Sequence, residues 1–258
     1  MRKSPTRLAV RWMNIARPPL KSRKFCTVVI NALKNLPKDN PERKKSKSVY
    51  RTMRILAVSD TVLDYLYSPQ ISNRFLKVDL VISCGDLPYY YPEYLTSLLN
   101  ASLYFIRGNH DRSADTPLQP HPAPLGGVDL HLRSVNHAGL ILAGVEGSIR
   151  YKEGPFMYSQ SEMWLHVFRL LPALWINKLR YGKFIDVFVT HAPPFGIHDQ
   201  TDYAHQGIRA FRWFDQVFQP AYHLHGHIHL YGQEQRQFSR LGKTQVINCY
   251  GFQEIIVP

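Results

Sequence analysis

The segment "HLHGHIH", residues 223–229, places histidines at four alternating positions: His223, His225, His227 and His229. In an extended strand successive side chains point to opposite faces, so this spacing predicts that all four share one face. Neutral imidazole is the commonest metal ligand among the side chains. The segment is therefore either a solvated, histidine-rich edge or the end of a strand that delivers ligands to a metal, and the rest of the chain has to decide.

Short apolar runs recur along the chain after Met53. They do not alternate with polar residues, which is typical of strands covered on both faces. We expect strands at 55–60, 78–86, 102–111, 139–147, 184–194, 221–229, 244–251 and 254–257.

Helical patterns lie between several of these runs. We expect helices at 92–100, 159–183 and 207–218. In the longest of them Ser161 could cap the start, Pro172 should kink or split the helix, and Gly182 should end it. This order of elements predicts one α/β domain, with two sheets or one large mixed sheet and with helices outside.

The net charge of +13 is unevenly distributed. Residues 1–54 contain 16 Lys and Arg against 2 Asp and Glu, a net charge of +14, whereas residues 55–258 contain 16 against 17, a net charge of −1. The near-neutral body argues against a nucleic-acid partner inferred from overall charge. We interpret residues 1–52 as a basic leader, disordered or non-native, and residues 53–258 as the folded domain. An organelle-type or membrane-touching basic tail is the alternative.

Cysteine usage and the apolar segments bear on the compartment. The three cysteines, Cys26, Cys84 and Cys249, are odd in number and show no paired spacing. That favours a reducing compartment, and we expect a cytoplasmic protein. The apolar run "FCTVVINAL" in the leader is too short to span a membrane, and no secretory cleavage pattern follows it. We therefore expect no membrane span. The sequence does not indicate an oligomeric state.

Polar residues follow five of the expected strands, at the point where each strand ends. In open α/β sheets the loops beyond the carboxyl ends of the strands form the ligand crevice. A single Asp or His at such a place is usually a cap or a satisfied core group, but five strand ends together are a strong signal. The segments concerned are "SDTV" (59–62), "CGD" (84–86), "GNHD" (108–111), "VTHAPP" (189–194) and "HGHIH" (225–229).

These segments resemble, in order and spacing, the motifs of the calcineurin-like metallophosphoesterase superfamily. The resemblance implies a four-layer α/β/β/α sandwich of two mixed sheets with helices outside. It also implies two divalent transition metals that share an activated hydroxide and hydrolyse a small phosphoester. Nitrogen and oxygen ligands without thiolate suit Mn, Fe or Zn better than Ca or Mg. By match, six residues are the metal ligands: Asp60, Asp86, Asn109, His191, His227 and His229.

The same resemblance assigns roles within the centre. Asp86 would bridge the ions, with Asp60 and His229 completing the first site. His110 would donate a proton to the leaving oxygen or stabilise the transition state, and Asp111 would orient His110, as carboxylates commonly do for imidazoles. A phosphodiesterase is favoured over a monoesterase, because no additional arginine cluster is evident to bind a dianion.

Val62 departs from the family pattern, which has histidine at this position. The occupancy of the first metal site is therefore uncertain. A water could replace the missing nitrogen, Asp64 or another loop could supply a ligand, or one tightly held ion could suffice. Capping of the following turn is the more ordinary role for Asp64. A catalytically impaired scaffold or binding protein of the same fold is the alternative function, and Val62 favours it.

Further polar residues could contact substrate or support the ligands. The loop after the 184–194 strand is dense in His and Asp and should overhang the metals, although such density often marks a solvated loop. His225 could support the two histidine ligands that follow it. Tyr89 could form a wall of the pocket for a base or sugar, although packing on the surface of a helix is an equally good explanation for it. The set comprises Asp64, Tyr89, His198, Asp199, Asp202, His205 and His225.

Overall fold

The computed structural model describes residues 52–75, 77–111, 121–230 and 237–258. All of the expected leader except Thr52 lies outside the described residues. Among the described residues, no helix combines the length and the apolar character needed to cross a bilayer.

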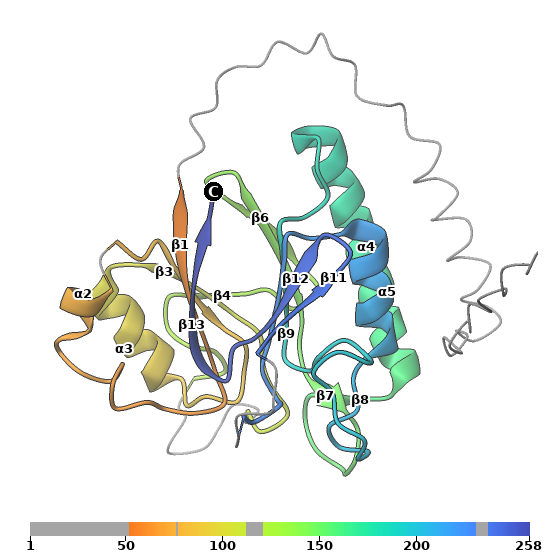
Figure 1. Ribbon diagram of the computed structural model, residues 1–258, viewed down its shortest axis with the longest axis horizontal. Coiled ribbons are helices and arrows are strands. Elements are labelled where there is room, and N and C mark those ends of the chain that lie inside the picture. Colours follow the sequence, from red (N-terminus) through yellow and green to blue (C-terminus); the bar gives the residue numbers. More distant parts are fainter. Residues whose placement is uncertain (1–51, 76, 112–120, 231–236) are drawn as a thin grey trace, which may run out of the picture. The chain divides into compact units, whose positions relative to one another are not determined.

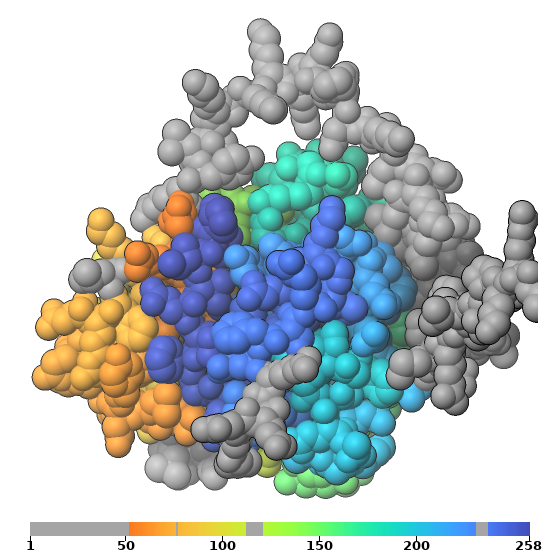
Figure 2. Space-filling model, viewed as in Figure 1, coloured from red at the N-terminus to blue at the C-terminus, as the bar shows by residue number. Residues whose placement is uncertain are grey.

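The first sheet begins the chain's folded part and also contains its last strand. Its strand order is β13 (Gly251–Val257), β1 (Met53–Ser59), β2 (Leu80–Ser83), β3 (Ser102–Phe105) and β4 (Gly127–Asp129). Strands β1 to β4 are parallel, and β13 pairs antiparallel with β1. In the space-filling view, orange residues from the start of the described chain lie beside dark blue residues from its end (Figure 2).

The second sheet has parallel strands at its centre and an antiparallel strand at each edge. Its order is β11 (Phe238–Leu241), β12 (Thr244–Asn248), β10 (Tyr222–His225), β9 (Val187–Thr190), β6 (Leu140–Val145) and β5 (Ser134–His137). Strands β12, β10, β9 and β6 are parallel, whereas β11 and β5 are antiparallel to their neighbours. A short pair, β7 (Ser148–Ile149) with β8 (Met157–Tyr158), stands apart.

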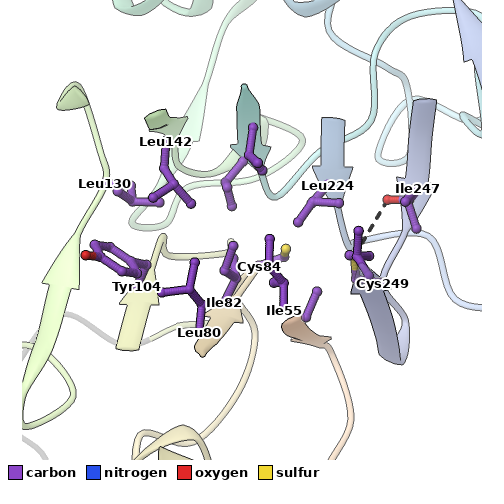
Figure 3. Packing of buried hydrophobic residues seen from close by; sticks show 14 of the residues in the cluster. Ile55, Leu80, Ile82, Cys84, Tyr104, Leu130, Leu142, Leu224, Ile247 and Cys249 are labelled. Atoms are coloured by element: carbon purple, nitrogen blue, oxygen red, sulfur yellow. Dashed lines mark hydrogen bonds between the residues drawn. The ribbon is translucent and has the colours of Figure 1, made fainter. Parts of the chain in front are cut away.

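The two sheets pack face to face around an apolar core. In β1, Ile55 and Ala57 belong to this core, whereas Leu56 and Val58 point to the opposite side, because side chains alternate along a strand. Figure 3 shows the core between the sheets, with Ile55 and Leu80 opposite residues of the second sheet such as Leu142. Both faces of β1 are therefore buried, as its continuous apolar run predicts.

Helices cover the outer faces. The described helices are α2 (Ile71–Arg74), α3 (Tyr90–Leu99), α4 (Gln160–Tyr181) and α5 (Arg209–Phe218). Helices α2 and α3 lie on the side of the first sheet, and α4 and α5 lie on the side of the second (Figure 1). Phe214 of α5 stacks on Phe188 of β9 with ring centroids 4.1 Å apart. The expected four-layer α/β/β/α sandwich of two mixed sheets is thus confirmed.

Two details of α4 differ from expectation. The cap is Ser159 rather than Ser161: its hydroxyl accepts from the N–H of Glu162, and the Glu162 carboxylate accepts from the N–H of Ser159. Pro172 does not split the helix, which runs unbroken to Tyr181. Pro172 is exposed, so its ring meets solvent rather than packed neighbours. Gly182 ends the helix with φ 78°, as predicted.

The predicted single face for the four histidines is wrong. Strand β10 ends at His225, and His227 then adopts a left-handed φ of 67° in a tight turn in which Ile228 N–H bonds the carbonyl of Gly226 at 2.8 Å. His223 and His225 do share a face, with ring centroids 6.1 Å apart. The turn redirects His227 and His229 away from it.

Candidate metal centre

The carboxyl ends of β1, β2 and β10 deliver side chains from backbone conformations that are rare for residues other than glycine. Asp60, Asp86 and His227 have φ values of 67°, 57° and 67°. A left-handed conformation at a residue with a Cβ costs roughly 1–3 kcal/mol and persists where the surrounding structure holds it. All three are candidate ligands from the sequence. Three of the ten described residues other than glycine with a positive φ are thus candidate ligands.

Two glycines let the backbone approach this site closely. A Cβ placed on Gly108 would lie 2.6 Å from Cε1 of His191 and would overlap the Asp86 carboxylate. A Cβ on Gly226 would lie 2.5 Å from Oδ2 of Asp60. Real Cβ contacts are longer than this, so only glycine fits at either position without a shift of the candidate ligands.

Asp86, His191 and His227 form a compact group of ligand atoms. Each offers one ligand atom, and these atoms all lie within 4.8 Å of one another. They come from the ends of β2, β9 and β10, which belong to both sheets. Three side chains placed in this way could hold a divalent ion.

His191 is held in the tautomer that a metal needs. Its Nδ1 lies 2.8 Å from the carbonyl oxygen of Cys84, which can only accept, so Nδ1 carries the proton. Nε2 then faces the Asp86 carboxylate at 3.2 Å and the Asn109 carbonyl oxygen at 3.1 Å. Two oxygens and an imidazole nitrogen converge there, and a cation satisfies all three. The residues present therefore fit a divalent metal.

The charges of this group reinforce one another. Burial alone would lower the pKa of His191, but the charge and hydrogen bond of Asp86 raise it to about 9. Burial alone would raise the pKa of Asp86, but His191 and the N–H of His110 lower it to about 2. The pocket is thus anionic enough to retain a proton on a buried imidazole, which is the position a metal would take.

His227 is neutral and offers its other nitrogen. Its Nε2 donates to the carbonyl oxygen of Ala204 at 3.0 Å, so the lone pair lies on Nδ1. Burial, followed by the charge of His191, lowers the pKa of His227 to about 4. Its backbone N–H binds both carboxylate oxygens of Asp60, at 3.1 and 3.0 Å.

Asp60 and His229 make a second, looser pair. The Asp60 carboxylate is fully buried, and Nε2 of His229 lies 3.6 Å from it. The hydrogen bond with Asp60 raises the pKa of His229. The His229 side chain is 40% exposed and its ring lies 4.9 Å from that of Tyr250. All six predicted ligands therefore take part in one connected set of contacts.

His110 and Asp111 differ in exposure and in the contacts that they make. The His110 side chain is exposed, and its backbone N–H donates to Asp86 at 2.7 Å. The Asp111 carboxylate accepts from the backbone N–H groups of Gly108 at 2.7 Å and Asp86 at 3.1 Å. Among the described residues it makes no hydrogen bond to the His110 ring. Asp111 thus ties two ligand loops together, and its orienting role for His110 stays a prediction.

Val62, at which the resemblance leads us to expect histidine, packs against an apolar layer. It is half-buried against the cluster that joins the first sheet to α2 and α3. Asp64 is exposed in the next turn, and within the described part of the chain no hydrogen bond joins it to the six predicted ligands. Neither residue brings a further ligand to the centre.

In the predicted substrate loop, Asp199 and Asp202 make hydrogen bonds within the loop, and one residue lies near the candidate ligands. Asp199 accepts from the N–H groups of Gly196 and Gly207, at 2.9 and 3.2 Å, and so fastens the loop. Asp202 holds His205 at 2.9 Å. The His205 ring lies 5.2 Å from that of His227. Of this loop's predicted residues, His205 is thus the one stacked beside a candidate ligand.

The remaining predicted residues are engaged within the fold. His225 is fully buried and its Nε2 meets Nδ1 of His198 at 2.8 Å. Nε2 of His198 meets the hydroxyl of Ser239 at 2.9 Å. Tyr89 is largely buried beside Phe105, so packing accounts for it better than a substrate wall does.

Three residues near the ligands were not predicted. Tyr250 packs beside His229, and Asn248 fixes the surrounding turn by donating to the carbonyl of Ile228 at 2.7 Å and accepting from the N–H of Tyr250 at 2.9 Å. The pattern of polar residues at strand ends could have indicated both, because Asn248 is the last residue of β12 and Tyr250 follows it. Tyr151, whose hydroxyl lies 3.5 Å from Nδ2 of Asn109, carries no comparable signal.

Comparison with known proteins identifies the family of the chain. The model of the calcineurin-like phosphoesterase family matches residues 53–231. One solved structure is 13% identical, with a TM-score of 0.55 over 80% of this chain and 99% of its own. The protein TT1561 of Thermus thermophilus is 17% identical, with a TM-score of 0.48 over 78% and 90%. Phosphopantetheinyl hydrolase (PptH) from Mycobacterium tuberculosis is 11% identical, with a TM-score of 0.48 over 76% and 88%.

At 13% identity, the first of these structures speaks for the fold alone. No curated protein matches the chain. The family match covers more than two thirds of the sequence and includes every candidate ligand. The chain belongs to the calcineurin-like phosphoesterase family, whose members are metal-dependent hydrolases.

Proposed function

We propose that this protein hydrolyses small phosphoesters, preferring diesters, with two divalent transition metals at the candidate centre. The observation that carries the proposal is the convergence of Asp86, His191 and His227, whose ligand atoms lie within 4.8 Å of one another. Their donors are oxygen and nitrogen without thiolate, which suits Mn, Fe or Zn. The two described cysteines, Cys84 and Cys249, are buried free thiols. They fit the reducing, cytoplasmic location that we also propose.

We assign the ligands as two sets that share Asp86. Asp60 and His229 complete the first set, and Asn109, His191 and His227 complete the second. Divalent ions held there would lower the pKa of a bound water and offset negative charge on phosphate oxygens. The contacts between Asp60, His227 and His229 support placing the two sets side by side.

His110 is the proposed proton donor to the leaving oxygen. Its side chain is exposed and therefore free to meet a substrate, while its backbone is fixed by Asp86. Asp111 holds the loops of Asp86 and Gly108 together by accepting a hydrogen bond from the backbone N–H of each residue. A general acid needs this combination of a reachable side chain and a fixed main chain.

The preference for diesters rests on the arginine next to the centre. Arg107 directly precedes the Gly-Asn-His-Asp segment, but its guanidinium is paired with Asp129 at 2.7 Å and Glu146 at 3.2 Å. It is therefore not available to bind the second charge of a monoester dianion. A diester carries a single negative charge at the phosphate.

The test is metal analysis combined with hydrolysis of bis-p-nitrophenyl and mono-p-nitrophenyl phosphate in the presence of Mn²⁺. The full chain and a chain starting at Met53 are compared, because we propose that residues 53–258 form the catalytic domain. We expect bound metal and faster hydrolysis of the diester in both. Bound metal with no hydrolysis of either compound would favour the alternative function, a catalytically impaired scaffold, for which Val62 speaks.

A further inference from the structure

A buried polar cluster lies directly behind the candidate ligand His191. It joins Thr190 of β9, His223 of β10 and Asp215 of α5, and all three are fully buried. His223 Nδ1 lies 2.7 Å from Oδ2 of Asp215, and Nε2 lies 2.8 Å from the hydroxyl of Thr190. Both ring nitrogens of His223 are thus committed to hydrogen bonds.

The hydroxyl of Thr190 fixes the direction of this chain of hydrogen bonds. It lies 2.7 Å from the carbonyl oxygen of Ala192, which can only accept, so the single hydroxyl proton points there. Nε2 of His223 must then carry a proton and donate to Thr190. One further proton is shared between Nδ1 and Asp215. Wherever that proton resides, the cluster is neutral overall.

Burial supports the same proton count. The other oxygen of Asp215, Oδ1, is buried without a hydrogen-bond partner among the described residues, and Phe188 and Phe211 flank the imidazole. A net charge in such surroundings would be costly. Burial also raises the pKa of Asp215. Burial therefore disfavours an Asp215 carboxylate beside a neutral His223 that lacks the Nε2 proton.

We propose that Asp215, acting through His223, is a positioning residue for His191. By keeping a proton on Nε2 of His223, it makes that imidazole a donor to Thr190, so the hydroxyl remains directed at Ala192 and closes the turn around His191. With Nε2 unprotonated, the imidazole would compete with Ala192 for the same hydroxyl proton. The inference rests on the proposed function in that His191 is taken as a metal ligand.

The first test needs no variant. Nitrogen-15 NMR of the metal-free full chain should show a proton bonded to Nε2 of His223. An unprotonated Nε2 would overturn the proposal. This measurement is independent of whether the protein binds metal or hydrolyses any ester.

The second test measures Mn²⁺ affinity by calorimetry. Thr190→Val, which keeps the shape but removes the hydroxyl, should weaken Mn²⁺ binding roughly 10-fold to 100-fold, as loss of a residue that supports a metal ligand does. Thr190→Ser should restore it to within about two-fold, because it keeps the hydroxyl. Asp215→Ala should weaken binding in the parent chain but add nothing to Thr190→Val, because we propose that Asp215 acts on His191 through that hydroxyl.

The outcomes separate the two proposals. A parent chain that binds no Mn²⁺ would contradict the proposed function. A parent chain that binds Mn²⁺, with Thr190→Val binding equally well, would contradict the positioning role. Equal losses from Asp215→Ala in both backgrounds would also contradict it, since a general structural effect adds independently.

Discussion

The backbone N–H of His227 donates to both carboxylate oxygens of Asp60, at 3.1 and 3.0 Å, across a separation of 167 residues. This contact joins the end of β1 in the first sheet to the turn after β10 in the second. The main chain of His227, a candidate ligand of the second metal, thus orients the carboxylate of Asp60, a candidate ligand of the first. The two proposed sites are therefore mechanically coupled.

Gly226→Ala should disturb that coupling. The added Cβ would lie 2.5 Å from Oδ2 of Asp60 and would overlap Ser59, so the Asp60 carboxylate must move. We expect loss of metal from the first site and a stability loss of about 1–3 kcal/mol. Metal stoichiometry and urea unfolding measure both. Gly154→Ala is the control, because its Cβ would meet only the flexible end of Met157. Equal behaviour of the two variants would contradict the prediction.

Asp86→Ala and His191→Ala should each remove bound metal and activity. Asp86 is the proposed shared ligand, and His191 faces it at 3.2 Å. We expect a fall in hydrolysis of at least roughly 10²–10³-fold, the order seen when one stabilising group of a reaction centre is removed. The exposed Asp64→Ala is the matched control and should change neither quantity. Hydrolysis that survives Asp86→Ala would mean that the assigned centre is wrong.

Val62→His should raise occupancy of the first metal site. It restores the nitrogen that the family pattern has at this position. Because Val62 is half-buried against the cluster beneath α2 and α3, we also expect a stability loss of about 1 kcal/mol. Metal content per chain at limiting Mn²⁺ is the measurement. Unchanged stoichiometry would show that another group already completes that site.

Asp111→Ala should destabilise the fold by about 2 kcal/mol, because the N–H groups of Gly108 and Asp86 both lose their carboxyl acceptor. Asp111→Asn keeps one acceptor oxygen and should cost less. Urea unfolding of both variants gives the comparison. A loss below about 1 kcal/mol for Asp111→Ala would mean that water replaces the carboxylate.

Stability of the metal-free protein should fall as pH rises from about 6.5 towards 9. The pKa of His191 is raised to about 9 by Asp86, from an ordinary value of 6.5. The stabilisation is therefore complete below the ordinary value and is lost as the imidazole deprotonates in the folded state. Unfolding free energies at pH 6.5 and pH 9 test this, with His191→Gln as the variant that should flatten the slope. A parent profile no steeper than that of His191→Gln would contradict it.

Much of the fold could be predicted because its information is local. The runs around β1, β2 and β9 are apolar on both faces, and that pattern alone identifies central strands. Strands β4, β5 and β11 were missed because they lie at sheet edges, where partly exposed residues give no such run. Ser159 was passed over for Ser161 because capping depends on the backbone conformation as well as on residue type.

The candidate site divides in the same way. The sequence alone placed carboxylate, amide and imidazole groups at the ends of strands. An apolar run and the polar residues that follow it are neighbours along the chain, so this pattern is local. Only the tertiary structure separated His227 and His229 from His223, because the turn at His227 is held by Asp60 from a distant strand. Tertiary packing likewise turned Val62 into an apolar layer and gave His223 the partners Asp215 and Thr190. Which groups meet across the two sheets is decided by burial and long-range hydrogen bonding, and no local pattern encodes these.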